Sequence, residues 1–314
     1  AANNPQDISM NDDFASICGI TEEELRRYFD AEVEVFAKKQ HVDKDAMYEM
    51  LKQKYDGYHF SSNSEDIYNP FSLLNSLKTR SLSNYWFATG TPTYLVTILK
   101  KKSYDLSKFS RGVTVMVESM TSFGNGDGSV IAALYQSGYL TIKSYDGKKY
   151  YRLGFPNEEV EDGFVQCLME EYTVTTSGEI DEDLQNLGSL ISMGDINGFM
   201  TQIQQIMSKI PFESNEPKLI EANFRNMLYL MIRSTGHKVL VEYPVLGGRI
   251  DVFFQTEQFA YVIECKRDQS AAEALAQIDE KKYADKLSVQ NKKIVKIGVN
   301  FSTEERNLTE WKEG

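Results

Sequence analysis

The last third of the chain carries an ordered series of apolar segments that restricts the fold more than any other feature. Residues 217–234 place apolar side chains at helical spacing, with Pro217 near the start and Gly236 after the end. Strand-like and helical segments then follow at 238–243, 249–255, 259–264, 271–287 and 293–300. The predicted order is helix, three strands, helix and strand, which indicates a mixed α and β domain.

Charged residues stand at the ends of two of these strands. Asp251 follows a Gly-Gly pair and begins an apolar strand, whereas Glu264 and Lys266 close the apolar run at 259–263. Side chains alternate along a strand, so Glu264 and Lys266 point to the same side. Such charges are costly at the end of a buried strand unless something pairs with them. Two carboxylates and a lysine suit a hard divalent cation beside a scissile phosphate.

The alternative interpretation is a solvated surface, because Asp-x(12)-Glu-x-Lys alone also occurs by chance. The order of the surrounding elements favours a site. Together they resemble the core of the PD-(D/E)xK nuclease superfamily, in which a glutamate of the first helix joins the strand aspartate and the Glu-x-Lys pair. The resemblance maps these positions onto Glu221, Asp251, Glu264 and Lys266. It implies that Asp251 and Glu264 bind Mg²⁺ or Mn²⁺, that Glu221 binds the ion directly or through water, and that Lys266 orients the attacking water.

Two residues of the second helix, Gln277 and Tyr283, resemble the Gln…Tyr signature of RecB-like members of the superfamily. In those members the pair supports the active site. An ordinary helix surface is the alternative for both residues, and the sequence does not decide between the two interpretations.

The N-terminal part resembles a narrower family, in which bacterial proteins join an AAA-ATPase-like region to a PD-(D/E)xK nuclease domain. Its characteristic stretches are found at 55–60, 68–72 and 85–93. Members of that family begin with a nucleotide-binding core, yet this sequence contains no G-x-x-x-x-G-K-[ST] motif. We therefore expect a fragment that lacks the P-loop core and does not bind ATP.

The expected fold class is a multidomain mixture of α+β and α/β parts. Residues 1–110 resemble the helical lid region of an AAA-ATPase, with helices expected at 22–39, 45–54, 70–77 and 92–100. Residues 111–210 combine a winged-helix-like unit, with a hairpin at 139–144 and 149–153, and a helical bridge. A generic α+β lid is the slightly favoured alternative for this unit, because its helices are not basic. Residues 211–314 form the αβββαβ restriction-endonuclease-like domain.

Charge is distributed unevenly along the chain. The net charge is −12, but residues 211–314 contain 15 Lys and Arg against 16 Asp and Glu, a balance of −1. This balance does not indicate strong, sequence-independent binding to DNA and favours a nuclease that a partner protein delivers. Three cysteines without a pairing pattern, and no signal peptide or membrane-spanning segment, predict a cytoplasmic protein without a membrane partner.

The combined expectation is a metal-dependent hydrolase that cleaves phosphodiester bonds of nucleic acid, with DNA as the expected substrate. Its activity would normally be coupled to the ATPase core. The alternative is a regulatory or protein-interaction module with a nuclease fold that no longer turns over. The intact set of carboxylates and lysine argues for the enzyme.

Overall fold

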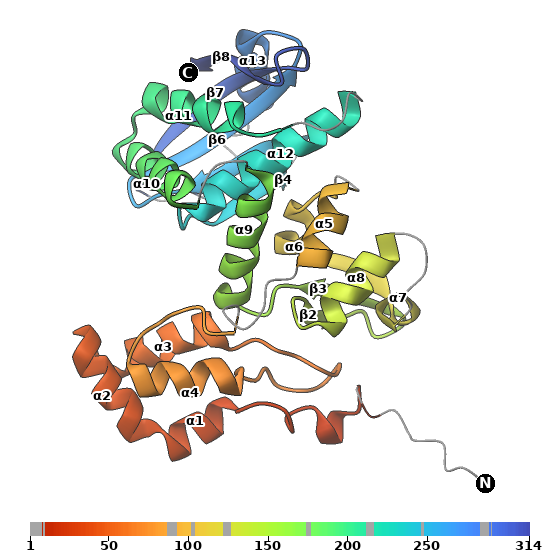
Figure 1. Cartoon of the computed structure of the whole chain (residues 1–314), viewed down its shortest axis with the longest axis vertical. Coiled ribbons are helices and arrows are strands. Elements are labelled where there is room, and N and C mark those ends of the chain that lie inside the picture. The colour runs from red at the N-terminus through yellow and green to blue at the C-terminus, as the bar shows by residue number, and fades with distance from the viewer. Residues whose placement is uncertain are drawn as a thin grey trace. The chain divides into compact units, whose positions relative to one another are not determined.

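The structure is a computed structural model of the 314-residue chain. It describes residues 8, 10–86, 93–101, 104–121, 127–173, 177–211, 217–245, 248–282, 289 and 291–314, except for some helical side chains, including that of Glu221. Helices and two sheets make a mixed α and β protein (Figure 1). The chain divides into a first unit, Ala1–Leu95 with Lys108–Phe164, and a second unit, Val96–Ser107 with Val165–Gly314.

The first unit begins with helices that pack around one apolar cluster. Leu25, Phe36, Leu51 and Tyr55 are fully buried within it. The predicted helix at 22–39 is interrupted at Phe29, which leaves helical geometry (φ −126°, ψ 13°) and packs against the cluster. The helical elements are η1 (Asp12–Phe14), α1 (Glu22–Tyr28), α2 (Asp30–Gln40), α3 (Lys44–Tyr55) and α4 (Pro70–Thr79).

A three-stranded antiparallel sheet follows in the first unit. The predicted hairpin is present as β2 and β3, and β1 pairs with the other edge of β3, giving the order β1-β3-β2. The strand β1 was not predicted, because it is only four residues long. The elements of this part are α6 (Ser107–Arg111), β1 (Val113–Met116), α7 (Val117–Thr121), α8 (Asp127–Gln136), β2 (Thr141–Tyr145) and β3 (Tyr150–Gly154).

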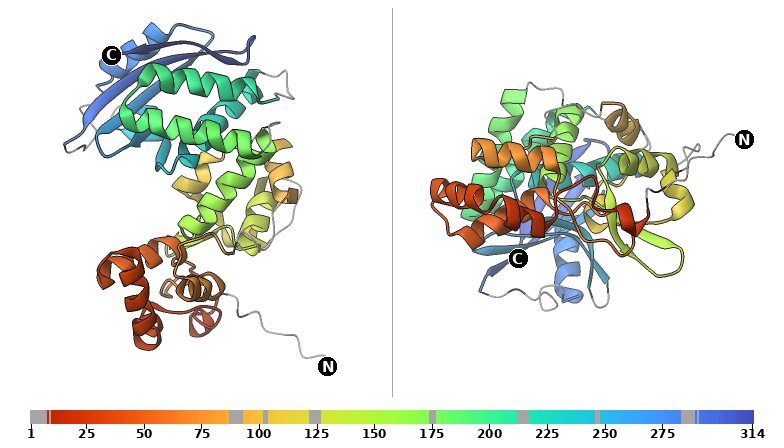
Figure 2. Two further views of the ribbon diagram at one scale, coloured as in Figure 1. Left: turned by 60° about the vertical axis from the view of Figure 1, so that its left-hand side comes forward. Right: turned by 90° about the horizontal axis from the view of Figure 1, so that it is seen from below.

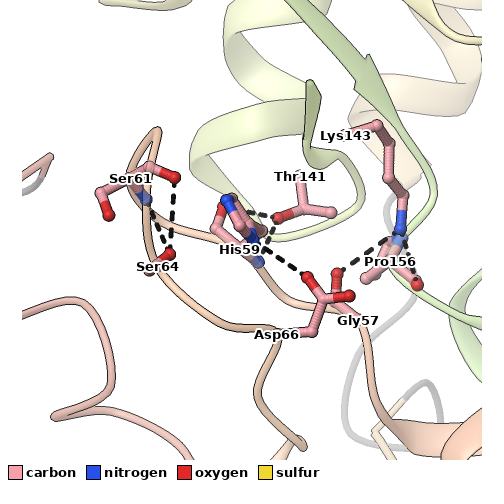
Figure 3. A network of polar contacts seen from close by, with 8 residues as sticks. All are labelled: Gly57, His59, Ser61, Ser64, Asp66, Thr141, Lys143 and Pro156. Carbon is pink, nitrogen blue, oxygen red and sulfur yellow. Dashed lines mark hydrogen bonds and ion pairs between the residues drawn. The ribbon is translucent and has the colours of Figure 1, made fainter. Parts of the chain in front are cut away.

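A polar network ties the segment after α3 to this sheet within the first unit (Figure 3). The backbone N–H of His59 donates to Thr141 Oγ1 (2.8 Å), and that hydroxyl donates to the carbonyl of His59 (2.9 Å). His59 Nδ1 pairs with Asp66 Oδ1 at 3.0 Å, and Lys143 Nζ donates to the carbonyl of Pro156 at 2.9 Å. These contacts give the stretch at 55–60 a structural role.

The helices α5, α9, α10, α11, α12 and α13 follow in the described part of the chain. No helix in the described ranges is long and apolar enough to cross a membrane. The boundaries between the two units along the chain fall inside α5, α6 and α9. The helices span α5 (Thr93–Lys101), α9 (Glu158–Tyr172), α10 (Ser177–Met193), α11 (Ile196–Ser208), α12 (Pro217–Ser234) and α13 (Ala271–Glu280).

A five-stranded sheet with the order β4-β5-β6-β7-β8 forms the centre of the second unit. The β6–β7 pair is parallel and the other pairs are antiparallel. The predicted αβββαβ order is present from α12 to β7, and β8 extends it. The strands are β4 (Val239–Val245), β5 (Gly248–Gln255), β6 (Phe259–Arg267), β7 (Lys293–Ser302) and β8 (Asn307–Glu313).

Helices lie on both faces of this sheet (Figures 1 and 2). On one face, Tyr261 of β6 donates its hydroxyl proton to the carbonyl of Ile191 in α10 (2.6 Å) and packs against Phe199 of α11. On the other face, Val262 packs with Leu275 of α13. The alternation of side chains along β6 thus separates the two layers and places Glu264 and Lys266 on the α13 side.

Candidate active site

Strand pairing brings the two candidate carboxylates together. Val252 of β5 pairs with Ile263 of β6 in an antiparallel ladder, so the next position places Asp251 opposite Glu264 on the same face. Asp251 Oδ2 accepts a hydrogen bond from the backbone N–H of Cys265 at 2.8 Å. Lys266 follows two residues after Glu264 on that face. The corner between β5 and β6 therefore holds two carboxylates and one ammonium group.

A single amide of α13 contacts two of these groups. Gln277 Nε2 donates to Glu264 Oε1, and Gln277 Oε1 accepts from Lys266 Nζ. The position of Gln277 depends on α13, which begins at the Ser270 capping box and buries its apolar face. Gln277 thus lies with the charged residues and is not part of an ordinary solvated helix surface.

Burial and a nearby carboxylate disfavour the ionised form of both Glu264 and Asp251. Glu264 is only 3% exposed, and burial followed by repulsion from the Asp251 carboxylate raises its pKa to about 8. Burial also raises the pKa of Asp251, which the N–H of Cys265 and the charges of Arg225 and Lys266 partly offset. An opposite charge between the carboxylates would relieve this repulsion.

Asp251 and Glu264 offer oxygen donors that suit a divalent cation. Glu264 Oε2 is buried and has no hydrogen-bond partner in the described part of the chain, which is costly for a polar atom. Carboxylate oxygens are ligands that Mg²⁺ and Mn²⁺ accept, and Mg²⁺ usually retains several waters. Among the residues whose side chains are described, no three His, Cys, Asp or Glu groups converge on one point. The pair Asp251 and Glu264 therefore fits a cation that completes its shell with water or a further ligand.

A cavity of about 190 Å³ opens beside the two strands. Asp251 and Lys266 line it, whereas Glu264 is not among its lining residues. The helix α12 supplies another wall with both apolar and cationic side chains. The remaining lining residues are Phe224, Arg225, Leu228, Glu242, Val252, Cys265, Arg267 and Phe301.

Three charged residues of this cavity, Arg225, Glu242 and Arg267, were not recognised in the sequence. Arg225 Nη1 pairs with Glu242 Oε1 at 2.7 Å, and Glu242 Oε2 is 3.3 Å from Arg249 Nη1. Helical spacing could have drawn attention to Arg225, because it follows Glu221 by four residues and so shares its helix face. Glu242 gave no comparable signal in the sequence. Its backbone is left-handed (φ 49°) within a strand, which is unusual for any residue except glycine, so strand alternation does not predict its position.

Comparison with known proteins supports the resemblance of this part of the chain. Residues 219–311 match the family model of the PD-(D/E)XK nuclease superfamily. These residues are a PD-(D/E)XK nuclease superfamily domain. The chain is also 29% identical, over 98% of its length, to an "uncharacterized protein in vnfD 5'region" of Azotobacter chroococcum mcd 1. It spans 58% of the length of that relative. No solved structure matches the chain.

Four of the six predicted site residues lie together in the nuclease superfamily domain. They are Asp251, Glu264, Lys266 and Gln277. Glu221 belongs to α12, but its side chain is outside the described part, and Tyr283 lies outside the described residues altogether. The roles of Glu221 and Tyr283 stay predictions.

Proposed function

We propose that the nuclease superfamily domain hydrolyses phosphodiester bonds of nucleic acid, with DNA as its substrate, and that it uses Mg²⁺ or Mn²⁺. One observation carries the proposal. Asp251 and Glu264 lie opposite each other with raised pKa values, beside Lys266 and a cavity. Such an arrangement is costly in the empty site and becomes favourable when a cation binds between the carboxylates.

Each residue has a distinct role in this proposal. Asp251 and Glu264 hold the cation, and Glu221 adds a ligand directly or through water. The cation, when bound, stabilises negative charge on the phosphate and lowers the pKa of a bound water. Lys266, which Gln277 holds in place, orients the attacking water and stabilises developing charge. Tyr283 supports the site from the segment that follows α13.

The test combines cleavage with direct detection of the ion. Labelled duplex DNA, single-stranded DNA and RNA are incubated with the protein and Mg²⁺, Mn²⁺ or EDTA. We expect cleavage with either metal and none with EDTA, because the two carboxylates alone cannot activate water. A Mn²⁺-soaked crystal should show anomalous density between Asp251 and Glu264. Lack of density there at saturating Mn²⁺ would contradict the proposal even if contaminating activity were present.

Gln277 provides a prediction about metal affinity. Gln277→Ala removes the side-chain amide that contacts both Glu264 and Lys266, so their geometry is less restricted. Loss of such a supporting residue typically weakens metal binding by about 10- to 100-fold, and we expect that loss for Mn²⁺ measured by calorimetry. Gln269→Ala is the matched control, because Gln269 is exposed in the loop before α13. Equal Mn²⁺ affinity in Gln277→Ala and wild type would show that the amide does not support the site.

The rest of the chain belongs to the same proposal. We infer that residues 1–110 are the lid-like region of an AAA-ATPase, that 111–210 comprise a winged-helix-like unit and a helical bridge, and that the nuclease domain at 211–314 is normally coupled to an ATPase core. The helices of the first unit and the hairpin of β2 and β3 are compatible with this assignment. Absence of ATP binding and a cytoplasmic location are further parts of the proposal.

A further inference from the structure

The helix α12 contributes a cationic side chain to the cavity. Arg225 of α12 lines the same cavity as Asp251 and Lys266, and its charge is close enough to affect the pKa of Asp251. The Arg225 side chain is 30% exposed, so a ligand in the cavity can reach it. Its planar guanidinium has the fork geometry that matches phosphate oxygens.

Glu242, a carboxylate that pairs with Arg225, has an unusual backbone conformation. Glu242 lies between the pairs Val241–Val252 and Tyr243–Ile250, and therefore opposite Asp251 across β4 and β5. Its backbone is left-handed (φ 49°), a conformation that costs energy for a residue with a Cβ. Strained residues of this kind concentrate at functional sites, where surrounding contacts maintain them. The carboxylate of Glu242 lies at the guanidinium of Arg225.

Glu242 can release Arg225 and keep its ion pair with Arg249. Its second oxygen is 3.3 Å from Arg249, whose side chain is 64% exposed. An incoming phosphate could therefore replace Glu242 at Arg225 while Arg249 continues to neutralise Glu242. The cavity would then present Arg225, Lys266 and Arg267 to the phosphate group.

We propose that Arg225 binds a backbone phosphate of the nucleic acid and that Glu242 is the carboxylate which this phosphate displaces. The inference rests on the proposed function and extends it to substrate binding. Arg225 is then a substrate-binding residue, and Glu242 holds its guanidinium toward the cavity in the absence of substrate. The group that Arg225 binds is the phosphodiester, which DNA and RNA share.

The experiment measures binding to fluorescently labelled oligonucleotides by anisotropy, with Ca²⁺ present and the oligonucleotide verified to remain intact. Arg225→Gln should weaken binding about tenfold at low salt and reduce the slope of log K against log salt by about 1, because one phosphate contact is lost. Glu242→Gln should strengthen binding, since the competing carboxylate is gone. Arg225→Lys keeps the positive charge but lacks the forked guanidinium, so its affinity for the oligonucleotide should lie between those of wild type and Arg225→Gln.

A matched control removes a charge of the same sign elsewhere in the domain. Lys296 pairs with Asp279 at 2.6 Å and does not line the cavity. Lys296→Gln therefore loses one positive charge and one ion pair, and its affinity and salt slope should equal those of wild type. Melting temperatures establish that each variant is folded.

The opposite signs of the Arg225 and Glu242 effects distinguish binding from a purely structural ion pair. If the pair only stabilised the fold, Arg225→Gln and Glu242→Gln would weaken binding together, and that result would overturn the inference. An unchanged salt slope in Arg225→Gln would also overturn it. Cleavage by wild type with normal binding by Arg225→Gln would reject the inference and leave the proposed function intact. A wild type that neither binds nor cleaves nucleic acid would reject both.

Discussion

Asp251→Ala and Lys266→Ala should each reduce Mg²⁺- or Mn²⁺-dependent cleavage by at least about a thousandfold, equivalent to roughly 4 kcal/mol of transition-state stabilisation. Asp251→Ala removes one of the two described carboxylates that face each other across β5 and β6. Lys266→Ala removes the ammonium group that Gln277 holds beside the cavity. Initial rates on the best substrate provide the measurement, and circular dichroism checks that the fold is retained.

The controls come from an ion pair in the same domain. Asp279→Ala and Lys296→Ala remove residues of the same types, which pair with each other at 2.6 Å away from the cavity. We expect both to cleave at the wild-type rate. Activity that survives in Asp251→Ala and Lys266→Ala, after purification controls for contaminating nucleases, would exclude the mechanism. A wild type that binds Mn²⁺ at Asp251 but never cleaves would favour the regulatory module.

Without added metal, the melting temperature should fall as the pH rises from about 5 to about 8. The folded-state pKa of Glu264 is about 8, above its ordinary value of 4.5, so the folded protein binds more protons than the unfolded chain between these values. Its contribution to stability is therefore present at low pH and is lost as the pH rises through the folded pKa. The raised pKa of Asp251 acts in the same direction. The total loss should be on the order of a few kcal/mol.

Mg²⁺ should restore the stability that the metal-free protein loses as the pH rises. The ion binds the deprotonated carboxylates of the folded protein, so the increase in melting temperature should be larger at about pH 8 than at about pH 5.5. Asp251→Asn removes one of the repelling charges. It should abolish most of the Mg²⁺ effect, flatten the pH dependence and stabilise the metal-free protein at the higher pH.

Differential scanning fluorimetry with and without Mg²⁺ at both pH values tests this expectation. Asp279→Asn is the matched variant, because Asp279 is exposed and pairs with Lys296; it should retain the wild-type response. A Mg²⁺ effect of equal size in wild type and Asp251→Asn at both pH values would place the ion elsewhere.

The sequence by itself determined the order of elements that builds the second unit. Helical spacing at 217–234 and apolar strand-like runs located α12, β4, β5, β6 and β7 to within a few residues. These signals are local, because each element must bury one face whatever its neighbours are. Period-two alternation also placed Glu264 and Lys266 on one side of β6 before any pairing was known.

Weaker local signals were missed. The edge strand β8 exposes much of its length and has no long apolar run, so its sequence does not distinguish it from a loop. The break at Phe29 was also missed, since helical spacing continues on both sides of it. In both cases contacts with other elements determine the conformation, and the local propensity of the sequence carries no information about those contacts.

Only the tertiary structure decided which charges meet. The β5–β6 register placed Asp251 opposite Glu264, and the packing of α13 against the sheet brought the Gln277 amide to both Glu264 and Lys266. The left-handed conformation of Glu242 likewise has no counterpart in the sequence. Register and packing arise from contacts between residues far apart along the chain. Sequence patterns therefore indicated the candidate residues, whereas folding determined their distances, burial and raised pKa values.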